Sequence, residues 1–390
     1  MLESQSDLRA LIIDPDPAYL AAIRRLLTRS LINWHCVYCE DAAEATELLQ
    51  KGFNPHLVVS DCLDSDIANG EDLLNFTQEI APAAVRVLMS AENSVNVLLA
   101  TTQVAHMVIG KPFNDAQLLA VFGRVQRLVF GPFTAHSRYQ IGLIQNLPVA
   151  KNNYQSIMAM LNDPETPTKV LAQALTRDAT ITAKLLQIAN SDYLGFSRQV
   201  LDLNDVIVRL GREMIKAILM SVQMHSQFEG RINTDLHQQL LNQSFSLAML
   251  ANQLAKTQFK LDTQLAEKAF MAGLLQVLGP LVLLSTMAPE EQALTNEDMF
   301  QDGIADHCLI SAYLMTLWGF DEDVCQAVLY RLNLAEVNSP TLLQTILHLA
   351  TYVLIYQQAK PNEELPPPCW AALEKFNLTE AFLTGKEVVQ

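Results

Sequence analysis

The chain has 390 residues, and its 26 Lys and Arg against 42 Asp and Glu give a net charge of −16 at pH 7. Half of the residues are hydrophobic, which is enough for two globular cores and excludes disordered and collagen-like chains. The lysines and arginines are scattered along the chain, and only Arg24 and Arg25 are adjacent, so the basic footprint that duplex DNA or an anionic membrane surface requires is missing.

Residues 1–128 alternate between short apolar runs and amphipathic stretches, which is the pattern of a parallel sheet with connecting helices. The pattern predicts strands at residues 10–13, 34–39, 56–60, 85–89 and 107–109, and helices at 18–28 and 42–51. We therefore expect an α/β domain over 1–128. Functional groups should gather at the loops that follow the carboxyl ends of its strands.

The alternation ends near residue 129, where the segment GPFTAHSRY predicts a linker at 129–140. Helical periodicity follows, at residues 152–161, 167–175, 181–189, 203–210, 212–223, 236–256 and 263–277. The pattern predicts an all-helical domain over 141–335 and a helical extension over 336–390 that packs on it. Asp178 and Asp202 each precede an apolar-periodic run, as helix N-caps do.

The sequence near the amino terminus has acidic residues before any apolar run, so we expect a cytoplasmic protein without a secretory signal. The uncharged stretch 271–288 contains Gln276, Gly279 and Pro280, so we expect a buried helix there and no membrane insertion. Six cysteines without a signal indicate free thiols. Cys36 and Cys39 have CxxC spacing, but their strand-like context favours packing over redox or zinc chemistry.

Polar residues follow four of the predicted strands in a characteristic order: acid, acid, hydroxyl and lysine. They are Asp14 and Asp16, then Asp61, Ser90 and Lys111. With the segments LIIDPDPAYL, PHLVVSDCL, VRVLMSAE and GKPF, this order resembles the receiver domain of bacterial response regulators over residues 8–128. The resemblance implies a flavodoxin-like, doubly wound fold.

The same resemblance implies that Asp61 is a phosphoacceptor and that Ser90 and Lys111 are the switch residues. Phosphoryl transfer to a carboxylate needs a cation to offset charge repulsion, so Asp14, Asp16 and Asp61 would bind Mg²⁺. The sequence departs from the receiver pattern at Pro15, which offers no carboxylate where receivers carry a second acid. A receiver-shaped scaffold that mediates contacts without phosphorylation is therefore the alternative.

The later segments LIQNLPVAKNNY, TRDATITAKLLQIANSDYLG, VIVRLGREMIKAIL, AFMAGLLQVLGPLVLL and ADHCLISAYLMTLWGF resemble the HDOD domain. This domain is a helical relative of the HD-type metal phosphohydrolases. Those enzymes need a His followed by an Asp, plus further histidines, to hold two metal ions. None of the eight histidines here is followed by Asp.

The metal-site positions of the HD-type enzymes carry other residues in this chain. Gln276 and Val277 replace the His–Asp pair, Arg331 and Leu332 replace a later His–His pair, and His307 alone remains. One imidazole cannot hold a dinuclear centre. We therefore expect no metal in the helical domain and no enzymatic activity.

These features predict a two-component signalling protein whose receiver-like domain controls a helical domain that acts by protein–protein interaction. The expected partners are a sensor histidine kinase, a downstream signalling protein and a second copy of the chain, but no nucleic acid. Two alternatives remain open: a metal-dependent cyclic-dinucleotide phosphodiesterase with an unrecognised ligand set, and an adaptor that binds a nucleotide.

Overall fold

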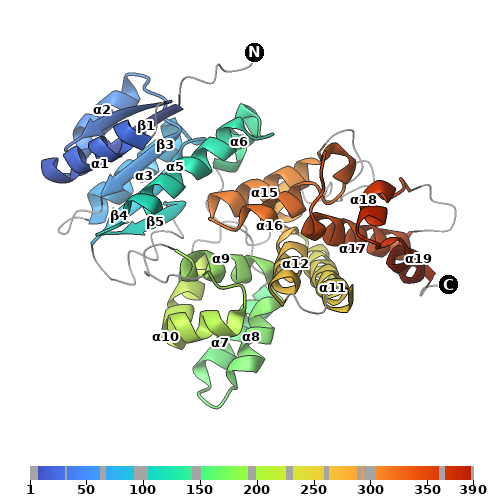
Figure 1. Ribbon diagram of the computed structural model, residues 1–390. Helices are drawn as coiled ribbons and strands as arrows, with labels where there is room; N and C mark the ends of the chain where they lie inside the picture. The colour runs from blue at the N-terminus through green and yellow to red at the C-terminus, as the bar shows by residue number, and fades with distance from the viewer. Residues whose placement is uncertain are drawn as a thin grey trace.

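The structure is a computed structural model, shown in Figure 1. It describes residues 8–30, 33–61, 67–91, 104–142, 151–191, 199–224, 232–258, 263–287, 292, 304–359 and 365–387. Within these residues an α/β domain is followed by a larger set of helices, as the sequence predicts.

In the described part of the chain, five parallel strands form one sheet in the order β2-β1-β3-β4-β5. The strands are β1 (Leu8–Ile13), β2 (Trp34–Cys39), β3 (Leu57–Asp61), β4 (Val85–Ser90) and β5 (Met107–Gly110). This order is that of flavodoxin-like folds, in which sites lie beyond the carboxyl ends of the strands. Cys36 and Cys39 lie in β2 as free thiols.

Helices cover both faces of the sheet because its strands are apolar on both sides. On one face Ala10 and Ile12 pack against α1 (Pro17–Ser30) and α5 (Asp115–Phe130). On the other face Leu11 and Ile13 pack against α2 (Ala42–Gln50) and α3 (Ile67–Ile80).

The stretch expected as a linker is largely helical. α5 continues to Phe130, and α6 (Ala135–Gly142) follows after a short connection. The guanidinium of Arg138 on α6 donates hydrogen bonds to the backbone carbonyls of Val129 and Phe133. These bonds fix the turn between the two helices, so the connection is a folded element.

The remaining described residues are helical, and they include two short C-terminal helices that the periodicity did not resolve. The elements are α7 (Lys151–Asn162), α8 (Thr168–Thr176), α9 (Ala179–Ala189), α10 (Leu203–Met224), α11 (Thr234–Gln258), α12 (Thr263–Leu275), α13 (Leu278–Thr286), α15 (Asp306–Leu317), α16 (Glu322–Leu329), a 3₁₀ turn (Leu334–Glu336), α17 (Leu342–Gln358), α18 (Trp370–Lys375) and α19 (Thr379–Glu387).

Two glycines shape this helical region. Gly211 has φ 74° and breaks α10 into the two helices that the sequence predicts. At Gly279, near the start of α13, a Cβ would lie 1.9 Å from the backbone oxygen of His307. Only glycine therefore allows α13 and α15 to approach this closely.

One apolar stretch in the described residues, Gln264–Thr286, has the length and composition of a membrane span. Its most apolar window is 83% buried inside the protein. This segment, which corresponds to α12 and α13, is the core of the helical region, in agreement with the expectation for residues 271–288.

The helical region packs on the β5 side of the sheet (Figure 1). The Gln187 amide on α9 donates a 2.8 Å hydrogen bond to the backbone carbonyl of His106, next to β5. The ring of Phe133 meets Tyr313 of α15 edge-to-face, with centroids 5.1 Å apart. Arg127 of α5 lies 3.7 Å from Glu322 of α16. These contacts join the two domains along the edge strand.

Candidate functional site

Four strands bring the predicted polar residues to one edge of the sheet. Asp14 follows β1, and Asp61 and Ser90 end β3 and β4. Lys111 follows β5, and its backbone N–H donates a 2.7 Å hydrogen bond to the carbonyl of Ser90. Because neighbouring parallel strands end at the same edge, the apolar strand pattern alone places these groups together.

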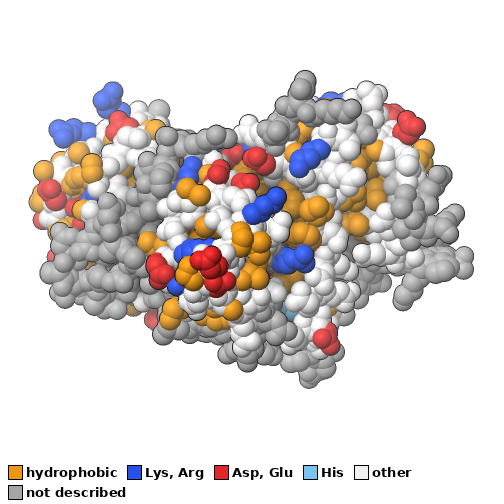
Figure 2. All heavy atoms as spheres, turned by 90° about the horizontal axis from the view of Figure 1, so that it is seen from below, with side chains coloured by type: hydrophobic (Ala, Val, Ile, Leu, Met, Phe, Trp, Pro, Cys, Tyr) orange, Lys and Arg blue, Asp and Glu red, His pale blue; other side chains and the backbone are white. Residues whose placement is uncertain are grey.

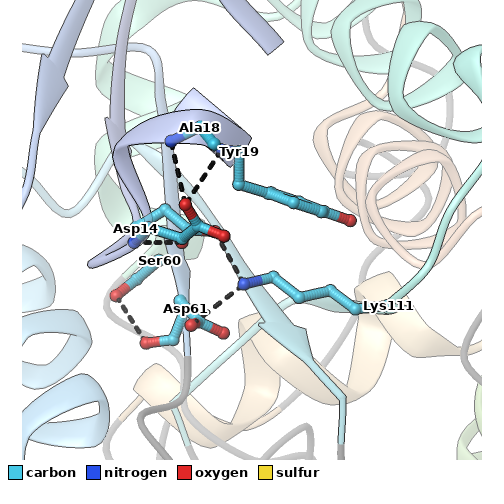
Figure 3. Close-up of polar contacts among 7 residues, drawn as sticks. Asp14, Ala18, Tyr19, Ser60, Asp61 and Lys111 are labelled. Atoms are coloured by element: carbon cyan, nitrogen blue, oxygen red, sulfur yellow. Dashed lines mark hydrogen bonds and ion pairs between the residues drawn. The ribbon is translucent and has the colours of Figure 1, made fainter. Parts of the chain in front are cut away.

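Lys111 bridges the two carboxylates at this edge (Figure 3). Its Nζ lies 2.6 Å from Oδ2 of Asp14 and 2.9 Å from Oδ2 of Asp61. The Asp14 side chain is fully buried, while those of Lys111 and Asp61 keep slight exposure, at 14% and 12%. The site is thus reached from solvent past Lys111 and Asp61, with Asp14 beneath them.

The surroundings of Lys111 stabilise its charged form. Burial by itself would lower the pKa of the ammonium, but hydrogen bonds to Asp14 and Asp61 and the charges of both carboxylates raise it overall. Tyr19 on α1 adds a cation–π contact, with Nζ 4.6 Å from the ring centroid. Tyr19 is not among the predicted site residues, although its position in the helix after Asp14 places it within reach of the site.

Asp16 has a different role from Asp14. Its Oδ1 accepts hydrogen bonds from the backbone N–H groups of Ala18 and Tyr19, at 2.8 and 3.4 Å, and so caps α1. Its own N–H donates to Oδ1 of Asp14 at 3.0 Å. No cluster of three acidic, histidine or cysteine side chains suitable for a metal occurs among the described residues. Asp14 and Asp61 therefore lie together at the site, whereas the Asp16 carboxylate caps α1.

The pair of Asp14 and Asp61 still fits Mg²⁺. This ion is commonly held by one or two carboxylates and keeps several waters. Asp14 and Asp61 would supply the carboxylate oxygens, and the bound ion would offset the charge of an incoming phosphoryl group. Pro15, at the start of the turn, contributes no ligand.

Ser90 lies beside this pair in a buried position. Its side chain is 1% exposed, and β4 pairs with β5 so that Ser90 stands opposite Gly110, next to Lys111. On the other side of β4, Asp61 of β3 stands opposite Met89, the residue before Ser90. The acid, hydroxyl and lysine that the sequence predicts in this order thus lie at one edge of the sheet.

The degenerate positions of the helical domain lie in its core. His307 in the first turn of α15 and Arg331 after α16 are brought together, with Nη2 of Arg331 3.0 Å from Nδ1 of His307. Val277 is 1% exposed and Leu332 is 8% exposed, as apolar core residues. The backbone carbonyl of Gln276 accepts a hydrogen bond from Ser311 on α15.

His348 on α17 extends this network and was not predicted. Its Nδ1–H donates to the carbonyl of Arg331 at 2.8 Å, and its Nε2 accepts from the N–H of Cys369 at 2.9 Å. Both ring nitrogens therefore form hydrogen bonds with the backbone, and they link α17 to Arg331 and Cys369.

Comparisons with known proteins match the two regions separately. Residues 147–334 match the model of the HDOD domain family. An uncharacterised protein of Treponema pallidum (strain Nichols) is 23% identical over 236 residues, which cover 57% of this chain. The matched part spans 45% of that relative, less than half of its length. The match to the HDOD domain family therefore lies within the helical region of the chain.

Solved structures of similar proteins include a response regulator. A fragment of the MmoQ response regulator from Methylococcus capsulatus is 20% identical and covers 60% of this chain and 93% of its own, with a TM-score of 0.46. The signal receiver domain of an HD domain-containing protein from Pseudomonas fluorescens is 19% identical and covers 32% of this chain and 97% of its own, with a TM-score of 0.29. A virulence factor from Campylobacter jejuni is 22% identical and covers 63% and 91%, with a TM-score of 0.40.

Proposed function

We propose that the chain is a two-component signalling protein in which a receiver domain controls a non-catalytic HDOD domain that binds other proteins. One observation carries the proposal. Lys111 joins Asp14 and Asp61 beside Ser90 at one end of strands whose other end contacts the helical domain. Lys111 of the proposed acceptor site therefore follows the carboxyl end of β5, and the contact with the helical domain lies at the opposite end of the same strand.

Phosphorylation of Asp61 would change the charge that Lys111 neutralises. An oxygen of the Asp61 carboxylate would attack the phosphorus of the donor. The bond from phosphorus to the leaving group would break, so that imidazole leaves from a phosphohistidine and acetate leaves from acetyl phosphate. The new phosphoryl oxygens would compete for Lys111, and the hydroxyl of Ser90 would donate to them. A histidine kinase is the physiological donor that this chemistry implies.

β4 and β5 provide a direct route from the acceptor to the helical domain. Ser90 and Arg86 lie at opposite ends of β4, about 13 Å apart at the usual rise of a strand. At that end Arg86 donates to the carbonyl of Val104, and His106 accepts from Gln187 of α9. A shift of the strand ends at Ser90 and Lys111 would thus be passed to the contact with α9.

The helical domain is proposed to act through its surface. Nδ1 of His307 faces the guanidinium of Arg331, and a fixed positive charge at that distance disfavours binding of a metal ion. This supports protein binding over phosphodiester hydrolysis. The proposed partner is a downstream signalling protein, with a second copy of the chain as a further partner.

The charge distribution supports a protein as the partner. On the face shown in Figure 2, Lys and Arg side chains are scattered singly among acidic and apolar ones. Together with the net charge of −16, this disfavours binding to nucleic acid or to an anionic membrane.

The proposal is tested by incubating the purified protein with acetyl phosphate and Mg²⁺ and measuring its intact mass. We expect a gain of one phosphoryl group in the wild type and none in the Asp61→Asn variant. Asp41→Asn, a change at an exposed helix cap of the same domain, is the matched control and should still be modified.

Two results would contradict the phosphorylation step. One is no mass gain under conditions that modify an ordinary receiver, and the other is an equal gain in Asp61→Asn. In either case the α/β domain would be a docking scaffold whose contacts alone control the helical domain.

A further inference from the structure

Arg331 and His307 form a buried polar pair in the helical domain that takes no part in the proposed phosphorylation. Arg331 is 5% exposed and His307 is 2% exposed. Nη2 of Arg331 is 3.0 Å from Nδ1 of His307, and the guanidinium also contacts the thiol of Cys308. The two residues are 24 positions apart and meet where α15 and α16 pack together.

The pairing fixes where the proton of His307 lies. A guanidinium can only donate hydrogen bonds, so Nδ1 of His307 must be the acceptor. Burial and the nearby charge of Arg331 lower the pKa of His307 to about 3, so the ring is neutral at pH 7. A neutral ring that accepts at Nδ1 carries its proton on Nε2.

Two buried donors of this pair have no acceptor in the part of the chain that the structure describes. They are the Nε2–H of His307 and the Nε–H of Arg331. Buried polar groups are nearly always hydrogen-bonded, and an unmade bond of this kind is costly. Both unmade bonds require an acceptor, so the missing group must accept hydrogen bonds.

The pair also lacks a negative charge. Among the described residues, no ion pair links Arg331 to a carboxylate. Lys268 in the same domain shows the usual arrangement, with Asp321 and Asp323 at 2.9 and 2.7 Å. Buried charges are normally paired, so an anion satisfies Arg331 better than water does.

We propose that Arg331 and His307 form a binding site for a phosphoryl oxyanion, either free phosphate or the phosphate of a small monoester. The planar guanidinium fork suits phosphate oxygens. His307 supplies a neutral donor, and His348 positions Arg331 through its backbone carbonyl. This site lies in the helical domain and is independent of phosphorylation at Asp61.

Equilibrium dialysis of the full-length protein tests the site. Labelled inorganic phosphate and AMP are the two probes, without Mg²⁺ and at constant ionic strength. We expect one phosphate or one AMP per chain, and Arg331→Met should weaken binding about 10-fold to 100-fold, as the loss of a charge-assisted hydrogen bond does. Lys268→Met removes a cation that already has carboxylate partners and should bind like the wild type.

The two probes separate the possible sources of the anion. Tighter binding of phosphate would identify the free ion, and tighter binding of AMP would identify a monoester; either supports the site. Absence of binding to both would overturn it. So would unchanged binding in Arg331→Met, or loss of binding in Lys111→Met, which would locate the anion in the α/β domain.

If Arg331→Met does not fold, the wild-type protein still gives the answer. Nitrogen-15 NMR of the histidine rings reports a hydrogen bond formed at Nε2. Phosphate should shift the Nε2 resonance of His307, identified as the signal that disappears in His307→Gln, and chloride at the same ionic strength should not. No shift at saturating phosphate would refute the assignment.

Discussion

At the scale of single residues, the buried histidines of the helical core are held as neutral rings. His348 donates from Nδ1 to the carbonyl of Arg331 and accepts at Nε2 from Cys369. Burial lowers its pKa to about 4, and the hydrogen bond to Arg331 only partly offsets this effect. The folded protein therefore binds fewer protons than the unfolded chain at mildly acidic pH.

This difference makes stability depend on pH. With a folded pKa of about 4 and an unfolded pKa of about 6.5, the contribution of His348 is present above pH 6.5 and is lost as the pH falls towards 4. At pH 5 the loss amounts to about 2 kcal/mol of unfolding free energy.

Urea unfolding at pH 7, 6 and 5 measures the effect. The His348→Asn variant keeps one donor and one acceptor but has no proton to gain, so its unfolding free energy should fall less between pH 7 and pH 5. Equal pH slopes in the two proteins would show that His348 is not held neutral.

At the scale of elements, helix α9 begins at a buried cap. Oδ1 of Asp178 accepts hydrogen bonds from the N–H groups of Thr180 and Ile181, both at 3.1 Å, and its side chain is fully buried. The cap of α2, Asp41, accepts from Glu44 at 2.8 Å but is exposed. Water can replace the Asp41 carboxylate but cannot reach the amides beneath Asp178.

The two caps should therefore differ in their effect on stability. Asp178→Ala leaves two N–H groups buried without an acceptor and should lower the unfolding free energy by about 2 kcal/mol. Asp41→Ala should cost about 0.5–1 kcal/mol. Urea midpoints followed by circular dichroism compare them, and equal losses would contradict the argument from burial.

The elements also show which parts of the fold can be predicted from sequence. The strands of the sheet are apolar runs bounded by polar loops, and Gly211 separates two amphipathic helices, so both were predictable. The bounds of helix α17, within the predicted helical extension, were not predictable, because the helix is buried without interruption from Leu343 to Val353 and so lacks an amphipathic period.

The candidate sites also divide into residues that a sequence pattern places and residues whose contacts depend on the fold. Asp14, Asp61, Ser90 and Lys111 were predictable because each ends a parallel strand, and such ends share one edge of the sheet. The role of Asp16 depends on the local turn, where its carboxylate caps α1. The contact of Arg331 with His307 depends on how α15 and α16 pack, which no spacing in the sequence reveals.

At the scale of the whole molecule, buried apolar clusters extend across both domains. Phe133, in the connection after α5, is 7% exposed and packs edge-to-face against Tyr313 of α15, which is 2% exposed. Nearby, Phe130 at the end of α5 is 44% exposed. These two phenylalanines differ mainly in whether they fill the space between the domains.

Truncating Phe133 should therefore loosen the domains, whereas truncating Phe130 should not. Phe133→Ala removes a buried ring and should cost about 3–5 kcal/mol of unfolding free energy. Phe130→Ala should change it by less than about 0.5 kcal/mol. Small-angle X-ray scattering should show a larger radius of gyration for Phe133→Ala alone, because the helical domain then separates from the β5 side of the sheet. If Phe133→Ala lowers stability and the radius stays unchanged, the aromatic contact supports the fold of one domain, and domain docking depends instead on Gln187 and the ion pair of Arg127 with Glu322.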